Sequence, residues 1–216
     1  NIAKKFNAKI FDFKWVDDFS AARNESLKHA EKDWILVMDA DEIIEKNDLD
    51  KIKNSIENTN DFVGFSLEQR SYISNFFEGA VKNNSDFELV KNYPFYIPHH
   101  LVRLFKNKLG LYFKNRVHEL IEDSIIAKNL KYEKLDVLLH HFGSLKDENL
   151  ISNKTEQYSK IIMNQLEENP DSARYNYQAA RMHLGKNDFN NALKYFEKTA
   201  KIDLNYKLVF SEIAKI

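Results

Sequence analysis

The sequence of 216 residues predicts an α/β fold, with a sheet-containing domain over residues 1–146 and a smaller α-helical region over residues 147–216. Three observations lead to this fold class. A run of five apolar residues at 34–38 shows no polar alternation, which is typical of a strand buried on both faces in a parallel sheet. Helical patterns flank this run, in the order of a βαβ unit. From residue 147 onward the sequence is polar and helical in pattern.

The first half of the α/β domain alternates between helix and strand patterns. In order, the sequence predicts the tail of a helix at residues 1–6, a strand at 9–13, a helix from an N-cap at Ser20 to about Ala30, the strand at 34–38 and a helix behind a cap at Asn47 or Asp48. A complete α/β domain normally opens with its own strand. We therefore expect the upstream part of the domain, with its first strand or strands, to be missing from this chain.

The second half of the domain contains further strand patterns. The sequence predicts strands at 62–67, 117–121 and 135–141, and a hairpin of residues 101–105 and 111–113 around the loop 106–110. Residues 70–100 lack a regular pattern and are rich in aromatic residues. A connection of this length is usually functional or mobile. Its rings suit either packing in the core or a binding surface.

The C-terminal region has the spacing of paired helices. Tyr158, Ile161, Ile162 and Leu166 form one apolar face ahead of Pro170. Small and aromatic residues then follow at spacings seen in a 34-residue tetratricopeptide repeat. They are Ala180, Gly185, Ala192 and Phe196, with Thr199 where alanine is usual. A plain helical hairpin without repeat relatives is the alternative.

Composition excludes several classes of function. The net charge of −1 and the pI of about 6.7 make no electrostatic case for nucleic acid or an anionic membrane. The chain has no cysteine, so a metal would have to be bound by Asp, Glu, His or water. No apolar run reaches the ~18 residues of a spanning helix, and residues 1–20 do not form a signal peptide. We expect a cytoplasmic protein with no transmembrane segment.

Three carboxylates follow the apolar run directly, at Asp39, Asp41 and Glu42. Ligands of α/β sheets bind beyond the carboxyl ends of the strands, so this cluster lies where a site is expected. Two aspartates at i and i+2 can aim oxygens at one hard cation that also bridges phosphates. The alternatives are a solvated loop and a cap for the next helix. A phosphatase using Asp-x-Asp usually has a hydroxyl residue two positions on, where Ile43 stands.

Several motifs together resemble the family 2 glycosyltransferases of the GT-A fold. They are Trp-Val-Asp-Asp-Phe-Ser-Ala-Ala-Arg-Asn at 15–24, Asp-Trp-Ile-Leu-Val-Met-Asp-Ala-Asp-Glu at 33–42, Val-Arg-Leu-Phe at 102–105, His118-Glu119 and His140-His141. The best-matching subgroup includes lipopolysaccharide-core glucosyltransferases and peptide S-glycosyltransferases, the latter with helical repeats behind the catalytic domain. The resemblance covers most of residues 3–145. Family members begin with a strand and an acidic turn that hold the nucleoside, and nothing in this chain matches them.

The resemblance implies transfer of a sugar from a nucleoside diphosphate, with UDP expected, to a glycan, lipid-linked or peptide acceptor with inversion. It implies that Asp41 ligates Mn²⁺ or Mg²⁺, while Asp39 faces the ribose or sugar and helps orient the cation. We expect Glu42 to brace the loop rather than bind the metal. The enzyme would be cytoplasmic, with a peripheral position at the inner face of the membrane as one option.

Four further residues are candidates for donor binding. Arg23 would contact the diphosphate from the first turn of its helix, or form a salt bridge with Asp17 or Asp18. Asn24 would bond either nearby backbone or the nucleotide. Arg103 needs a partner if buried, which is a carboxylate of the acidic loop or the diphosphate. His118 would contact the metal or phosphate, or orient Glu119.

The resemblance also suggests how a proton leaves the acceptor. Inversion needs a base on the acceptor's side, and Glu119 is our candidate. His141 is a candidate for completing the metal shell, with His140 as its competitor. The aromatic residues of 72–96 would suit an acceptor wall as well as the core.

A second hypothesis is a non-catalytic interaction protein. The helical repeats would then bind a peptide or another protein, or support homo-oligomers, and the α/β domain would be vestigial. An intact Asp39/Asp41 pair argues against such decay.

Overall fold

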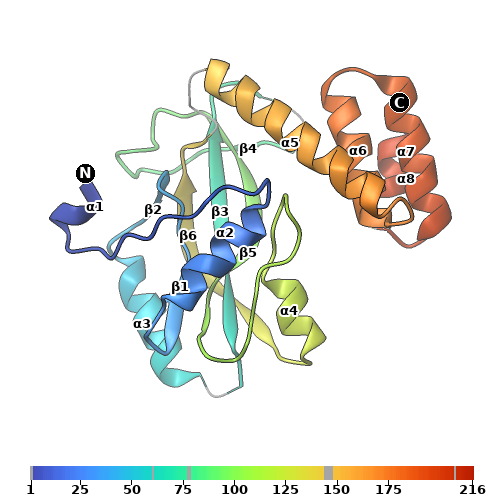
Figure 1. Cartoon of the computed structure of the whole chain (residues 1–216). Helices are drawn as coiled ribbons and strands as arrows, with labels where there is room; N and C mark the ends of the chain where they lie inside the picture. The colour runs from blue at the N-terminus through green and yellow to red at the C-terminus, as the bar shows by residue number, and fades with distance from the viewer. Residues whose placement is uncertain (1, 60, 77–78, 144–147, 207) are drawn as a thin grey trace. The chain divides into compact units, whose positions relative to one another are not determined.

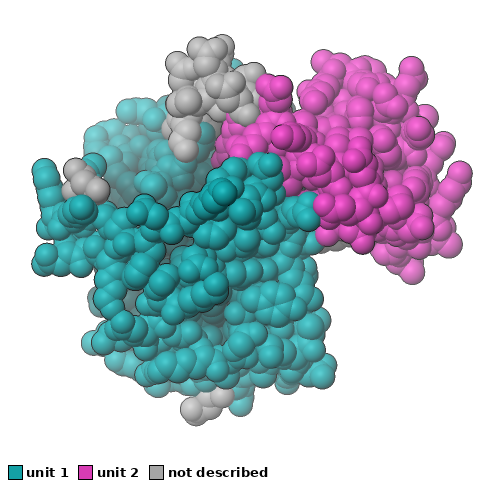
Figure 2. All heavy atoms as spheres, in the orientation of Figure 1, with its two compact units in different colours: residues 1–151 teal, residues 152–216 magenta. Residues whose placement is uncertain are grey.

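The computed structural model describes residues 2–59, 61–76, 79–143, 148–206 and 208–216. It confirms a mixed α/β domain followed by a helical region (Figure 1). The chain divides into two compact units, Asn1–Ile151 and Ser152–Ile216, which are coloured separately in Figure 2. The predicted boundary between residues 146 and 147 lies outside the described residues.

The first unit contains one mixed sheet. Its strands are β1 (Trp34–Leu36), β2 (Glu42–Ile44), β3 (Gly64–Ile73), β4 (Val81–Lys82), β5 (Phe95–Lys106) and β6 (Tyr132–His141). The strand order is β1-β5-β3-β6-β2, and β4 pairs with β5 off this path. β3 and β6 are parallel, whereas the other paired strands are antiparallel. β1 lies at one end of the order, so the prediction of a central parallel strand at 34–38 is wrong for the described strands.

Helices pack on both faces of this sheet. They are α2 (Phe19–Lys28), α3 (Asp48–Asn58) and α4 (Glu122–Ala127), whereas α1 (Ile2–Lys5) has no buried residue. Leu104 and Phe105 are consecutive on β5 and belong to different core clusters, so the two clusters lie on opposite faces. Ile52 of α3 joins the cluster of Leu104. Ile125 of α4 joins that of Phe105, against which Leu27 of α2 also packs.

The N-terminus of α2 differs from the prediction by its cap. Asp18 is the N-cap, with extended backbone, and its carboxylate accepts a hydrogen bond from the backbone N–H of Ala21 at 3.0 Å. Ser20 lies inside the helix and donates its hydroxyl to the same carboxylate at 2.7 Å. Aspartate and serine both make good caps, so the sequence Asp-Phe-Ser did not distinguish them.

Three strand predictions are wrong. Residues 9–13 are extended without pairing, and residues 111–113 and 117–121 form no strand beyond one isolated bridge between Lys114 and Leu120. The longest partner of β5 is instead β3, which pairs with it over ten residues. A long partner satisfies far more backbone groups than the short predicted hairpin would. The prediction of irregular structure over 70–100 is also too long, because β3 continues to Ile73 and β5 begins at Phe95.

The aromatic residues of this region fall into two groups. Tyr72 and Tyr96 are buried with Val90, and Phe87, Tyr93 and Phe142 pack against them. Phe76 is exposed and meets Phe95 edge to face, with ring centroids 5.5 Å apart. Most of these rings therefore belong to the core, and an acceptor wall stays a prediction for the pair of Phe76 and Phe95.

Tyr72→Phe is expected to destabilise the first unit. The Tyr72 hydroxyl is 2.7 Å from Nδ1 of His140, whose side chain is fully buried. Removing the hydroxyl leaves a buried ring nitrogen without this partner, which costs about 1–3 kcal/mol. Urea unfolding would measure the loss. The matched control is Tyr112→Phe, because Tyr112 is exposed; equal stability of the two variants would contradict a structural Tyr72–His140 contact.

The second unit is a set of helices with its own core. They are α5 (Glu148–Glu168), α6 (Ala173–Gly185), α7 (Phe189–Ile202) and α8 (Val209–Ile213). Ala180 and Ala192 are fully buried and face Phe196, as the repeat spacing predicts for closely packed helices. Thr199 is also buried, and its hydroxyl donates to the backbone oxygen of Tyr195 at 2.9 Å. This local bond explains how a hydroxyl occupies the alanine position.

Candidate active site

The acidic loop connects β1 to β2, which lie at opposite ends of the strand order. Its first end is held by a hydrogen bond from Val37 N–H to the Arg103 carbonyl at 2.8 Å. Its second end is held by a bond from Phe142 N–H to the Asp41 carbonyl at 3.0 Å. The loop therefore spans from β5 to the end of β6, and it brings side chains of distant strands together.

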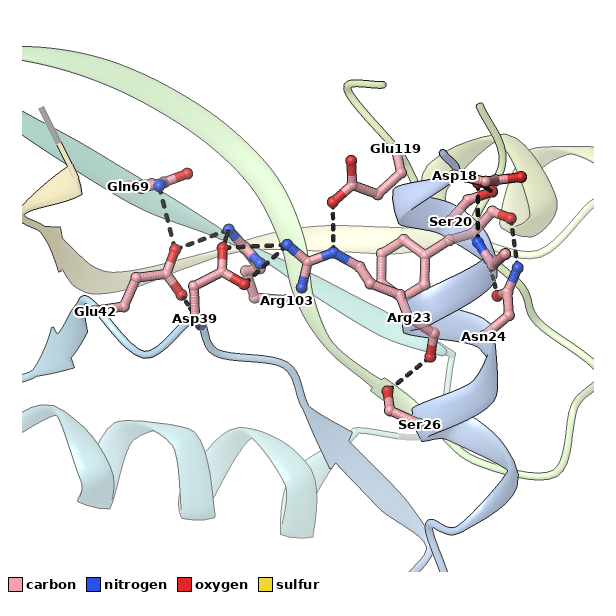
Figure 3. Close-up of polar contacts among 12 residues, drawn as sticks. Asp18, Ser20, Arg23, Asn24, Ser26, Asp39, Glu42, Gln69, Arg103 and Glu119 are labelled. Atoms are coloured by element: carbon pink, nitrogen blue, oxygen red, sulfur yellow. Dashed lines mark hydrogen bonds and ion pairs between the residues drawn. The ribbon is translucent and has the colours of Figure 1, made fainter. Parts of the chain in front are cut away.

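Arg103 is buried, and its positive charge pairs with two carboxylates of this loop. Its Nη2 lies 2.8 Å from Oε1 of Glu42 and 3.5 Å from Oδ2 of Asp39 (Figure 3). The Glu42 side chain has no exposed surface and also accepts hydrogen bonds from Gln69 and from the backbone N–H of Asp39. Burial raises the pKa of Glu42, although the charge of Arg103 opposes the shift. Glu42 thus braces the loop, and Arg103 has the carboxylate partners that the sequence offered as one alternative.

Arg23 links Asp39 to Glu119. Its Nη2 is 2.9 Å from Oδ1 of Asp39, and its Nε donates to Oε1 of Glu119 at 2.5 Å (Figure 3). Burial alone would lower the pKa of Arg23, but the charges of the two carboxylates outweigh it and the pKa is raised. The structure therefore pairs Arg23 with Asp39 and Glu119 rather than with Asp17 or Asp18.

Asn24 contacts backbone, and His118 lies in the turn before Glu119. The Asn24 side chain exchanges two hydrogen bonds with the backbone of Phe113, at 2.9 Å and 2.7 Å. This is the backbone alternative that the sequence allowed. His118 is exposed and has left-handed backbone with φ of 55°. It precedes Glu119 in a turn, not in the predicted strand.

The two histidines at the end of β6 have different surroundings. His140 is fully buried between Tyr72 and Glu45, and burial lowers its pKa. His141 has its Nε2 3.8 Å from Oδ1 of Asp41, while its Nδ1 lies 2.9 Å from the Ser71 hydroxyl. Of the pair, His141 therefore faces the acidic loop.

Comparison with known proteins identifies the family. The sequence profile of "Glycosyl transferase family 2" matches residues 1–117, which is more than half of the chain. The chain belongs to this family.

Curated relatives extend the similarity into the helical unit. A TPR repeat-containing protein of Synechococcus elongatus is 23% identical over 206 residues, which are 93% of this chain and 46% of that protein. The glycosyltransferase SunS of Bacillus subtilis and that of Bacillus phage SPbeta are each 24% identical over 196 residues, or 90% of this chain and 41% of theirs. The chain thus spans less than half the length of these relatives.

The sequence resemblance led us to expect a divalent cation at the acidic loop, and the residues here fit one in part. Asp41 offers carboxylate oxygens and His141 offers Nε2, both of which are ligands for Mn²⁺. Ser71 at Nδ1 orients the imidazole, as a partner on the far nitrogen of a metal-binding histidine does. Within the described ranges there is no cluster of three or more Asp, Glu, His or Cys suited to a metal ion. The donor diphosphate and water would therefore have to supply the remaining ligands.

Gly143 provides the space in which these two groups converge. A Cβ added at Gly143 would lie 2.7 Å from Cε1 of His141 and 3.1 Å from Oδ2 of Asp41. Ordinary carbon contacts are about 3.5–4.0 Å. A side chain at this position would therefore push the imidazole away from the carboxylate.

Gly143→Ala is expected to weaken metal use without unfolding the protein. We expect the Mn²⁺ concentration for half-maximal activity to rise about tenfold or more, as for loss of groups that orient metal ligands. Titration of activity with MnCl₂ would measure it. Gly185→Ala is the matched control, because nothing lies within 4 Å of a Cβ there. Equal metal dependence of both variants would contradict a site at Asp41 and His141.

Sequence reasoning missed the residues that support the family's acidic loop. Gln69 and Ser71 lie on β3 and contact Glu42 and His141. They reach these partners because β3 runs parallel to β6, with Ser71 opposite His141 in the register. No sequence signal marks them, since the pairing of β3 with β6 joins segments about 70 residues apart.

None of the described helices has the length and apolar character needed to span a membrane.

Proposed function

We propose that this chain forms part of an inverting glycosyltransferase that uses a nucleoside diphosphate sugar, with UDP as the expected nucleotide. The observation that carries the proposal is the row of alternating charges Glu42, Arg103, Asp39, Arg23 and Glu119, with Asp41 and His141 at its side. Family membership supports glycosyl transfer in general. The acceptor would be a glycan, a lipid-linked molecule or a peptide; SunS and the repeat-containing relative support no narrower choice.

In this proposal Asp41 and His141 hold Mn²⁺ or Mg²⁺ together with the donor diphosphate. When bound, the cation neutralises the charge that develops on the departing diphosphate. Asp39 lies two positions before Asp41 in the loop, and its carboxylate is held by the guanidinium groups of Arg23 and Arg103. A carboxylate held in this way is preorganised to bind hydroxyls of the ribose or sugar.

Glu119 takes the proton from the acceptor in this proposal. Inversion requires attack from the side opposite the leaving diphosphate, so the base must lie across the sugar from the metal. Glu119 comes from the turn before α4, outside the acidic loop, yet a single guanidinium joins it to Asp39. A base so placed is within reach of an acceptor next to the donor sugar.

One screen tests the proposal. The full-length protein is incubated with UDP- and GDP-sugars and Mn²⁺, with and without EDTA, and released nucleotide is measured. Saturable hydrolysis that disappears with EDTA would support a metal-dependent transferase. Absence of both nucleotide-sugar binding and hydrolysis would contradict it and favour an interaction protein that uses the helical repeats.

A further inference from the structure

Arg23 lies between the two carboxylates that the proposed function assigns to donor and acceptor. We infer that Arg23 is a positioning residue, which holds Glu119 in place relative to Asp39, and that it is not a ligand of the donor diphosphate. This inference rests on the proposed function, since it needs Glu119 as base. It departs from one of the two alternatives that the sequence left open, in which Arg23 contacts the diphosphate.

The place of Arg23 in its helix argues against a diphosphate contact. Because Asp18 is the cap and α2 begins at Phe19, Arg23 is the fifth helical residue. The unpaired N–H groups that favour anions belong to the first four positions of a helix. The helix terminus therefore does not support an anion at Arg23, and the side chain points toward Asp39 and Glu119 instead (Figure 3).

The guanidinium contacts both carboxylates, each through a different nitrogen. Nε donates to Glu119 at 2.5 Å, and Nη2 meets the two Asp39 oxygens at 2.9 Å and 3.1 Å. Because the donors of a guanidinium have fixed directions, these contacts set both the distance and the angle between the carboxylates. A second guanidinium also restrains Asp39, because Nη2 of Arg103 lies 3.5 Å from its Oδ2.

The backbone on either side of this bridge is also fixed. Asn24 is joined to the backbone of Phe113, and Phe19 N–H donates to the Arg116 carbonyl at 3.0 Å. Lys114 and Leu120 exchange two hydrogen bonds across the turn that carries Glu119. These backbone hydrogen bonds hold α2 and this turn in place without Arg23. The contribution of Arg23 is therefore to orient the Glu119 side chain.

The positive charge of Arg23 holds the two carboxylates close to each other. Asp39 and Glu119 would repel each other without a cation between them. The Arg23 and Glu119 side chains are only 21% and 13% exposed, so water screens their attraction less than at the surface. The contact uses Oε1 of Glu119, and Oε2 is the oxygen we assign to the proton of the acceptor. Rotation of Glu119 after loss of Arg23 would misdirect that oxygen.

The test compares Arg23→Lys and Arg23→Gln with Arg70→Lys as the matched control. Arg70 pairs with Glu68 at 2.7 Å and lies over the Tyr96 ring, so it resembles Arg23 but has no place in the proposed machinery. Each full-length variant is assayed with Mn²⁺ and the UDP- or GDP-sugar that wild type hydrolyses. kcat and KM are measured, and calorimetry gives the Kd of the corresponding nucleoside diphosphate.

A positioning role predicts a kcat about tenfold or more below wild type for Arg23→Lys, with KM and Kd changed by less than about twofold. Arg23→Gln should behave alike, and Arg70→Lys should match wild type. In a Glu119→Gln background, Arg23→Lys should lower kcat by less than about twofold, because residues that act as a unit are not additive. Melting temperatures identify which of the two Arg23 variants folds best, and the inference is judged on that one.

Two results would overturn the inference. A rise in KM and Kd with kcat retained would make Arg23 a diphosphate ligand. A full additional loss of kcat in the Glu119→Gln background would show that Arg23 acts independently of the base. Failure of the proposed function looks different, because wild type would then hydrolyse none of the nucleotide sugars.

Discussion

Asp41→Asn is expected to abolish metal-dependent transfer while the protein stays folded. Asp41 is the carboxylate of the acidic loop nearest to His141, at 3.8 Å, and the pair is the part of the site that fits a cation. An amide offers one neutral oxygen in place of two charged ones. We expect activity to fall about 1,000-fold, or about 4 kcal/mol, which is comparable to the charge stabilisation that a metal supplies.

The measurement is nucleotide release at increasing MnCl₂ for wild type, Asp41→Asn and the control Asp61→Asn. Asp61 is exposed just before β3, so its substitution should leave activity unchanged. Circular dichroism would verify that Asp41→Asn keeps its helices. Partial recovery at high Mn²⁺ would agree with a weakened ligand set, whereas wild-type turnover at every concentration would exclude Asp41 as a ligand.

The sequence indicated that Arg103 needs an oppositely charged partner, but it did not identify the partners of Arg23. Arg103 stands among apolar strand residues, and a buried charge needs an opposite charge. That rule led to the acidic loop as one of two partners, and the structure supplies Glu42 and Asp39. Arg23 gave no such signal, because its partners lie 16 and 96 residues away along the chain. Long-range pairs depend on the topology, which a single sequence leaves open.

The turn around Glu119 shows why apolar residues misled the prediction. Val117 and Ile121 are both fully buried, which is what an alternating strand would also require. The backbone between them turns at His118, which is left-handed, and Asn115 shortly before Val117 is left-handed as well. Burial of an apolar side chain is compatible with either backbone. Asn115 and His118 carried a hint, since asparagine and histidine adopt left-handed conformations more often than most residues.

Glu119→Gln is expected to lower kcat about 100-fold or more with little change in donor KM. General-base catalysis typically contributes about 10²–10⁴-fold, and glutamine cannot accept the proton of the acceptor. Glutamine keeps the size of glutamate and an oxygen that can accept from Nε of Arg23. The fold and the donor site should therefore remain, and the loss should fall on the chemical step.

Glu122→Gln separates this effect from general damage to the segment. Glu122 lies three residues further on, in α4, and its carboxylate accepts a hydrogen bond from the Val102 backbone N–H at 2.6 Å. Its substitution should lower stability by about 1 kcal/mol or more while kcat changes little. If Glu119→Gln instead lowers kcat and donor affinity equally, Glu119 supports the donor site through Arg23 and Asp39 and another group takes the proton. A selective loss of kcat leaves the base as the explanation, because glutamine can keep the contact with Arg23 but cannot take the proton.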